Sequence, residues 1–221
     1  MKIAETRTDR SRIAAIVTAA TLMFAAAASA QTVRYEPQPT GSKMKMEGTS
    51  TIHDWTVESP TIGGFIEADP NFPESALKDP KSARPDVQVF IPVETLKSYA
   101  EAMDAVMQDH MNMEKYPRIE YRLTELKPRS APGAAGPLKF YAVGALTVSG
   151  TTQTVSMPVT IERIDKTKIK VVGSTPLKMT DFDVEPPAPR ILGMPTIKTG
   201  DDITISFEWL LEQKPGPTKT Q

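Results

Sequence analysis

The sequence predicts an all-β fold of eight to nine antiparallel strands with one short amphipathic helix. Apolar and polar residues alternate with a period of two along most of the chain from Lys43 onward, and this pattern is typical of strands because successive side chains point to opposite faces of a sheet. Nearly every predicted strand has one apolar and one polar face, as antiparallel sheets do, whereas parallel strands are apolar on both faces. Stretches rich in proline or glycine separate several of the strands.

The first thirty residues have the three parts of a secretory signal peptide. A basic start is followed by an alanine-rich apolar run over 13–28 and then by the small residues Ala28-Ser29-Ala30. The run is shorter than the roughly 20 residues that a membrane-spanning helix needs. We therefore expect cleavage after Ala30 and a periplasmic or secreted protein that starts near Gln31. A retained signal anchor is the alternative.

Length and composition limit the function classes that the rest of the chain can serve. We expect one domain over 31–213 and a disordered polar tail over 214–221. Without the four basic and two acidic residues of the first thirty positions, the net charge is −3, which is too small, and the charges are too evenly scattered, for a surface that binds nucleic acid. The chain has no cysteine, which excludes thiol catalysis, cysteine-ligated zinc and iron–sulfur clusters. A bacterial periplasm fits this composition.

The predicted strands are placed by their alternating apolar positions. They lie at 43–47, 52–59, 62–68, 86–91, 119–124, 140–149, 154–162, 169–177 and 203–211. A long antiparallel sheet either closes into a barrel, which removes its edges, or forms a two-sheet sandwich, and periodicity alone does not separate the two. Pro158 lies inside the clearest strand and cannot donate to the ladder, so we expect it at an edge, at a bulge or where pairing is broken.

One segment has a helical period instead. Its apolar positions recur at intervals of three and four and are Tyr99, Met103, Val106, Met107 and His110. They predict an amphipathic helix of about three turns. The methionines at 103, 107, 111 and 113 fit ordinary core packing, or a flexible lid over a barrel mouth. The proline-rich segment 70–85 and the segment 127–137 are predicted to be loops.

The two histidines each stand beside an aspartate, as His53-Asp54 and Asp109-His110. Neighbours along a strand point to opposite faces, and neighbours along a helix do not face each other, so neither pair predicts a catalytic dyad. We expect His53 to lie on a strand and to point inward with Trp55. A composite site built from both histidines is an alternative, but their spacing is not a metal motif, and no nucleophile elbow is present. We predict no catalytic residues and no metal ligands.

Six segments, in order, resemble the YceI-like family of exported bacterial proteins. They are GTSTIHDWTVES with IGGFIEAD, VQVFIPVETLKS, DHMNMEKYPRIEYRLTEL, GALTVSGTTQTVSMPVTI, MTDFDVEPP and GDDITISFEW. Two positions depart from the family pattern: Thr152 stands where valine is common, and Asp183 stands where glycine is common, which puts a tight turn in doubt. The resemblance implies a lipocalin-like, elongated antiparallel barrel of about eight strands, with the helix near its mouth and a long lipid tail in its apolar interior.

The function that this resemblance implies is lipid binding. We expect an exported carrier or buffer for a polyisoprenoid or similar amphiphilic lipid, with no catalysis, no cofactor besides the bound lipid, and transient contact with a membrane or envelope protein; a dimer is compatible with this role. The candidate wall or lid residues are Trp55, Phe65, Phe90, Met103, Met107, His110, Tyr121, Leu146, Met157, Phe182, Phe207 and Trp209. Two alternatives stay open: an enzyme or metal-binding protein that uses His53 and His110, and a packed barrel that acts through its surface.

Overall fold

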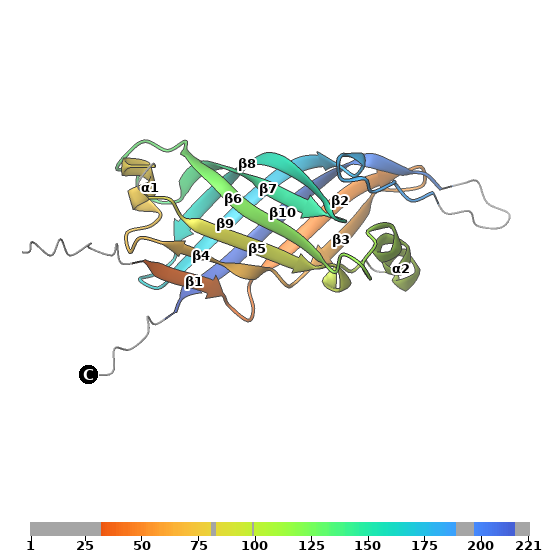
Figure 1. Cartoon of the computed structure of the whole chain (residues 1–221), viewed down its shortest axis with the longest axis horizontal. Helices are drawn as coiled ribbons and strands as arrows, with labels where there is room; N and C mark the ends of the chain where they lie inside the picture. The colour runs from red at the N-terminus through yellow and green to blue at the C-terminus, as the bar shows by residue number, and fades with distance from the viewer. Residues whose placement is uncertain (1–31, 81–82, 99, 189–196, 215–221) are drawn as a thin grey trace, which may run out of the picture.

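The computed structural model describes residues 32–80, 83–98, 100–188 and 197–214. The predicted signal peptide lies outside these ranges, as do Tyr99 and the predicted tail beyond Lys214. Within them the chain is mostly strand (Figure 1). The strands are β1 Val33–Pro37, β2 Lys43–Ser50, β3 Trp55–Ser59, β4 Gly63–Ala68, β5 Asp86–Pro92, β6 Arg118–Pro128, β7 Leu138–Val148, β8 Thr151–Arg163, β9 Lys168–Lys178 and β10 Thr199–Gln213. The helices are α1 Glu74–Lys78 and α2 Glu101–His110, with 3-10 turns η1 Val93–Thr95 and η2 Thr180–Phe182.

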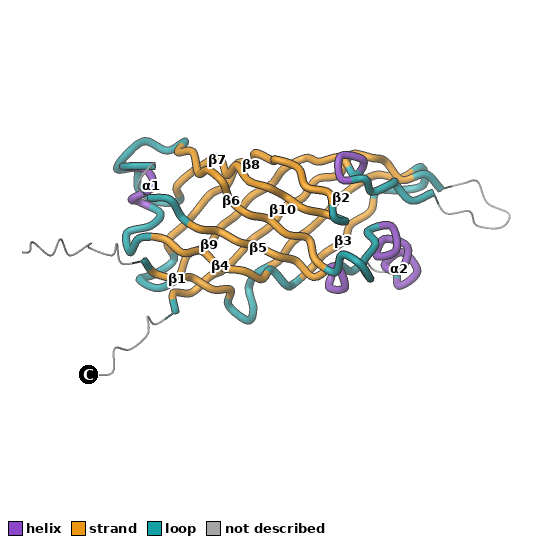
Figure 2. The backbone as a smooth tube through the Cα atoms, in the orientation of Figure 1, coloured by secondary structure: helices purple, strands orange, loops and turns teal. Residues whose placement is uncertain are grey.

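The strands form one antiparallel sheet that closes on itself. Its order is β1-β4-β5-β6-β7-β8-β9-β10-β2-β3, and an additional pairing of β1 with β10 joins eight of the strands into a barrel. The β2–β3 hairpin continues the sheet from β10. The barrel is elongated, with α1 at one end and α2 at the other (Figure 2). The predicted all-β, antiparallel, lipocalin-like barrel with one amphipathic helix near an end is confirmed, and the sandwich alternative is not.

Burial of the inward side chains differs between the two ends of the barrel. At the α1 end, inward residues such as Leu138, Phe140 and Leu211 are fully buried. Toward the α2 end, inward residues on the same strands, such as Leu146 on β7 and Ile205 on β10, are only half-buried. An apolar residue that faces inward but still has exposed surface lines an empty space and is not part of a packed core. The barrel therefore has a solid α1 end and a hollow α2 end.

A bulge in β6 keeps the apolar side chains of this strand on the inward face of the barrel along its whole length. Ile119, Tyr121 and Leu123 share one face, and the register then shifts between Leu123 and Glu125. The extra residue returns Leu126 to the interior, where it is buried. A bulge does this because it places two residues opposite one on the neighbouring strand.

Pro158 lies where pairing between β8 and β9 is broken, as the sequence predicts. It is matched with Tyr141 on β7, but the β8–β9 ladder begins only at Val159. A residue without an N–H is tolerated at such an unpaired edge. Asp183, where the resemblance put a tight turn in doubt, adopts the left-handed conformation at φ 55°, which aspartate tolerates better than most residues.

Two sequence predictions about local structure are wrong. The segment 70–85 contains the helix α1, whose Ala76 and Leu77 are buried against the closed end of the barrel. The strand predicted over 52–59 begins only at Trp55, and His53 lies in a turn. The hydroxyl of Ser50 forms this turn because it accepts the N–H of Ile52 and of His53, both at 3.3 Å, and donates to the His53 carbonyl at 2.7 Å. Serine hydroxyls favour turns in this way.

The helix α1 is joined to β8 by an ion pair whose strength depends on pH. Arg163 donates to the Glu74 carboxylate at 3.2 and 3.0 Å and also to the Phe72 carbonyl. Burial alone would raise the pKa of Glu74, but the hydrogen bonds from Arg163 and from its own backbone N–H, with the charge of Arg163, lower it below the ordinary 4.5. A carboxyl whose pKa is lower in the folded state stabilises the fold above its unfolded pKa and loses that contribution as pH falls.

We therefore expect Glu74→Gln to lower the free energy of unfolding near neutral pH by up to about 1 kcal/mol, the range for partly exposed ion pairs. The difference from the wild type should shrink as the pH falls below 4.5, because Glu74 is protonated first in the unfolded chain and then, at lower pH, in the folded protein. Urea unfolding of both proteins at a series of pH values measures this difference in the free energy of unfolding. A difference that stays constant with pH would contradict the role of the charge.

Candidate functional site

A cavity of about 520 Å³ lies inside the hollow end of the barrel. This volume falls in the range of about 300 to 1,000 Å³ that is usual for small-molecule sites. The floor is formed by buried side chains, among them Phe72, Ile66 and Trp209. The opposite end includes two exposed apolar residues, Ile52 at 54% and Met103 at 39% exposure. The cavity is therefore closed at its floor and open at its mouth beside α2.

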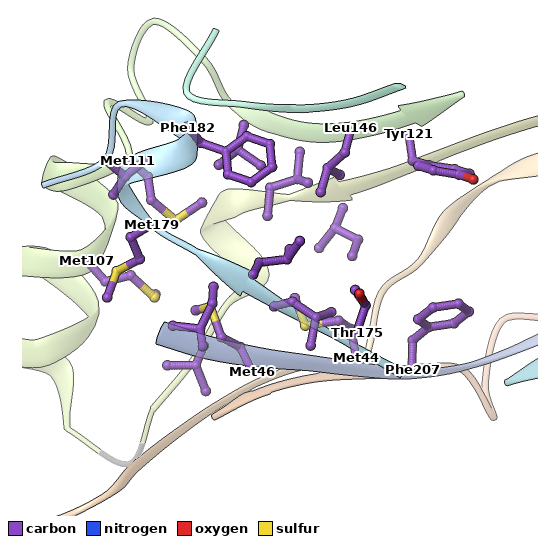
Figure 3. A pocket seen from close by; sticks show the side chains of 18 of the residues that line it. Met44, Met46, Met107, Met111, Tyr121, Leu146, Thr175, Met179, Phe182 and Phe207 are labelled. Carbon is purple, nitrogen blue, oxygen red and sulfur yellow. The ribbon is translucent and has the colours of Figure 1, made fainter. Parts of the chain in front are cut away.

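The wall of the cavity is almost entirely apolar because the strands contribute mainly the side chains of their inward faces. The strand residues are matched across the sheet, for example Val89 with Tyr121 and Tyr121 with Leu146. Further wall residues are Met44 and Met46 of β2, Ile119 and Leu123 of β6, and Ile203, Ile205 and Phe207 of β10. Figure 3 shows Met107 and Met111 beside Met179 at the α2 side, with Tyr121 and Phe207 at the other side of the same space.

Two hydroxyl groups interrupt the apolar wall away from the mouth. Thr175 donates to the Pro176 carbonyl at 3.3 Å. The Tyr121 hydroxyl is buried and has no hydrogen-bond partner among the described residues. Its ring lies over Gly144, where an added Cβ would be 2.5 Å from the phenol oxygen, so only glycine leaves room for it. Burial raises the pKa of the Tyr121 phenol well above its ordinary value of 10, and the group stays neutral.

Both histidines line the mouth of this one cavity, although they come from distant parts of the chain. His53 lies on the β2–β3 turn, and its Nδ1 is 2.7 Å from the Asp54 carbonyl oxygen. His110 ends α2, and its Nδ1 is 2.8 Å from the Glu185 carbonyl oxygen. Neither ring contacts the carboxylate of the neighbouring aspartate through a hydrogen bond within the described residues.

The structure brings together nearly all of the candidate residues. Those that line the cavity are Trp55, Phe90, Met103, Met107, His110, Tyr121, Leu146, Met157, Phe182, Phe207 and Trp209. Phe65 is not among the lining residues, because its ring lies against the Arg34 guanidinium at 3.7 Å. Phe90 borders the cavity, yet its ring covers Gly63 and faces the Arg118 guanidinium at 4.5 Å. Alternation places Phe90 opposite the exposed Glu120, so its ring belongs to the outer face.

Several lining residues were missed by the sequence reasoning. Met44 and Met46 lie on the inward face of β2, and the alternation that placed this strand was sufficient to find them. Met179, just before η2, also lines the cavity, and no periodic signal marks it. Ile52 lines the mouth of the cavity from the turn at Ser50. The sequence predicts a strand at this position, so the turn and the place of Ile52 could not be found.

The described part of the chain contains neither a cluster of metal-ligating side chains nor a membrane-spanning helix. No group of three or more His, Cys, Asp or Glu residues there could hold a metal ion. In the same ranges, no helix combines the length and the apolar character needed to span a membrane.

The fold and the cavity together define a class: an antiparallel barrel with a closed floor, an open mouth and an apolar interior. The YceI-like domain family model matches residues 35–210. The chain therefore belongs to the YceI-like family. A search of the curated proteins found no match.

Solved structures share this fold at low sequence identity. BcnA of Burkholderia cenocepacia is 19% identical with a TM-score of 0.58, and the match covers 76% of this chain and 95% of BcnA. A polyisoprenoid binding domain from Saccharophagus degradans, implicated in plant cell wall breakdown, is 14% identical with a TM-score of 0.60, over 81% of this chain and 98% of that domain. The Campylobacter jejuni YceI protein is 16% identical with a TM-score of 0.51, and the match covers 72% of this chain and 85% of that chain.

Proposed function

We propose that this protein is an exported carrier or buffer that holds the tail of a polyisoprenoid or similar amphiphilic lipid in its barrel and performs no chemistry on it. The observation that carries the proposal is the apolar cavity with a closed floor and an open mouth, which lies inside an elongated barrel. A lipid with one long apolar tail and a polar head fits this shape, since the tail can reach the floor while the head stays at the mouth.

The energy of tail burial is sufficient for tight binding. Transfer of apolar groups from water is worth about 0.8 kcal/mol per CH₂, so one five-carbon isoprene unit contributes on the order of 4 kcal/mol. Binding also costs translational, rotational and conformational freedom, which offsets part of this gain. A few buried isoprene units therefore give strong binding without a specific polar contact.

Three further observations support the proposal. The Saccharophagus degradans domain with the same fold is described as polyisoprenoid binding. Methionines at the mouth, including Met103, Met107 and Met111, supply flexible apolar surface that adapts to a tail. Residues 1–30 have the sequence pattern of a cleaved export signal, and transient contact of the exposed Ile52 and Met103 with a membrane or envelope protein would allow exchange of the lipid.

Tryptophan fluorescence tests the proposal, because both tryptophans of the chain line the cavity. Trp55 is half-buried toward the mouth, whereas Trp209 is buried at the floor and donates its Nε1–H to the Ile62 carbonyl at 3.2 Å. We expect titration with geranylgeraniol to shift the emission to shorter wavelength, because the lipid removes water from Trp55.

Two variants identify the tryptophan that gives the shift in emission. Trp55→Phe should lose most of the shift, and Trp209→Phe should keep it, while both still bind the lipid in an extraction assay. Saturable binding with no change at Trp55 would place the lipid elsewhere on the protein. No binding of any prenyl lipid would contradict the proposed function.

A further inference from the structure

The two imidazoles at the mouth are held in the same protonation arrangement. In each ring Nδ1 lies at hydrogen-bond distance from a backbone carbonyl oxygen, that of Asp54 for His53 and that of Glu185 for His110. A carbonyl oxygen only accepts, so Nδ1 must carry the proton in both rings. A neutral imidazole has one N–H and one lone pair. The lone pair therefore lies on Nε2 in both histidines.

Neither Nε2 atom has a hydrogen-bond partner within the described ranges. Nearby serine hydroxyls of the same lining are already engaged by the protein. Ser50 holds the turn that carries His53, and Ser98 donates to the Asp104 carboxylate at 2.7 Å. The mouth thus offers two free hydrogen-bond acceptors beside an apolar tunnel.

We propose that Nε2 of His53 and of His110 accept hydrogen bonds from the head group of the bound lipid, so that the cavity selects uncharged heads that carry hydroxyl donors. This inference rests on the proposed function and adds the class of head group to it. A hydroxyl donates to a lone pair, whereas an ether or a quinone carbonyl has no proton to give. An ionised anionic head likewise has lone pairs of its own and no proton to donate to the two acceptors.

The backbone around each ring fixes its position before the ligand arrives. The N–H and C=O of His53 are both bonded to the Ser50 hydroxyl. His110 ends a ten-residue helix, and its bond to Glu185 joins that helix to the segment after η2. Acceptors that are already oriented lose little freedom when the head group binds. The two residues act on head selection, while tail burial supplies most of the affinity.

The test compares geranylgeraniol with its methyl ether, which has the same tail and lacks the donor. At about pH 8.5, above the range in which imidazoles ordinarily titrate, we expect the wild type to bind the alcohol about threefold to tenfold more tightly, as one net hydrogen bond allows. Competition of each compound against a fluorescent prenyl probe measures the two dissociation constants.

The matched variants separate the two ring nitrogens. His53→Asn/His110→Asn keeps an amide N–H near the position of Nδ1 and removes the acceptor at Nε2, so it should bind the alcohol and the ether with equal affinity. His53→Gln/His110→Gln returns an amide oxygen near the position of Nε2 and should restore the preference in part. Circular dichroism confirms that each variant keeps the barrel.

The outcomes distinguish this inference from the proposed function. Equal binding of alcohol and ether by the wild type, or an unchanged preference in the double Asn variant, would overturn the role of the histidines while tail binding stands. Failure of the wild type to bind either compound would overturn both.

Discussion

Filling the hollow end of the barrel should abolish lipid binding while the protein stays folded. Leu146 on β7 and Ile205 on β10 line the cavity from strands that are three positions apart in the barrel order. In a Leu146→Trp/Ile205→Trp variant, the two indoles occupy space that the tail would use. Exclusion of even one isoprene unit removes on the order of 4 kcal/mol of apolar burial, so we expect retention of lipid to fall by more than about a hundredfold.

Quantitative lipid extraction after purification measures this effect. The matched control is Ile164→Trp, because Ile164 is 48% exposed and is not among the residues that line the cavity. This control adds the same indole outside the tunnel and should retain wild-type lipid. Wild-type retention by a folded double variant would show that the tail does not use the cavity.

Truncation of a leucine should be far more damaging at the solid end than at the hollow end. Leu138 and Leu146 lie on the same strand, β7, and both point inward, but Leu138 is 2% exposed whereas Leu146 is half-buried against the cavity. Leu138→Ala creates a void in a packed core and should cost about 2 to 5 kcal/mol. Leu146→Ala only enlarges an existing space and should cost less than about 2 kcal/mol.

Denaturant unfolding of the lipid-free protein measures both variants. The residue type and the strand are the same, so the difference reports packing alone. Equal losses of stability at the two positions would contradict the division of the barrel into a solid and a hollow end.

Alternation in the sequence was sufficient to place most strands and to assign their inward faces, because a strand buried on one side must repeat with period two. It did not establish closure. The barrel closes through β1, a short strand that ends in a proline and pairs with β10 at only three matched positions, Tyr35, Glu36 and Pro37. Such a short segment carries no reliable periodic signal, so alternation does not predict it as a strand.

The two local errors have the same origin, because a local interaction overrides the pattern. The proline-rich segment 70–85 predicts a loop, yet the apolar side chains of Phe72, Ala76 and Leu77 dock on the closed end and support a helical turn there. The residues 51–54 continue an alternating pattern, but the Ser50 hydroxyl bonds the backbone of His53 and turns the chain. Side-chain hydrogen bonds of this kind compete with strand pairing.

The cavity itself could be predicted only in part. The alternation of apolar positions along the strands identified residues of its wall, and Leu146, Tyr121 and Phe207 line the cavity. The same phase also describes Leu138 and Phe140, which belong to the solid core. Apolar side chains that surround a tunnel and those that fill a core alternate identically, so the position of the hollow depends on the three-dimensional packing.

Native mass spectrometry of the protein purified from its native cells or their culture medium, followed by lipid extraction, tests the central claim most directly. The account predicts a fraction of the protein with one bound molecule per chain, and an extract of lipids whose masses differ by whole isoprene units. The Leu146→Trp/Ile205→Trp variant prepared in the same way should lack these species. A wild-type protein that is folded, correctly exported and free of any bound lipid, and that takes up none when prenyl lipids are added, would contradict the account.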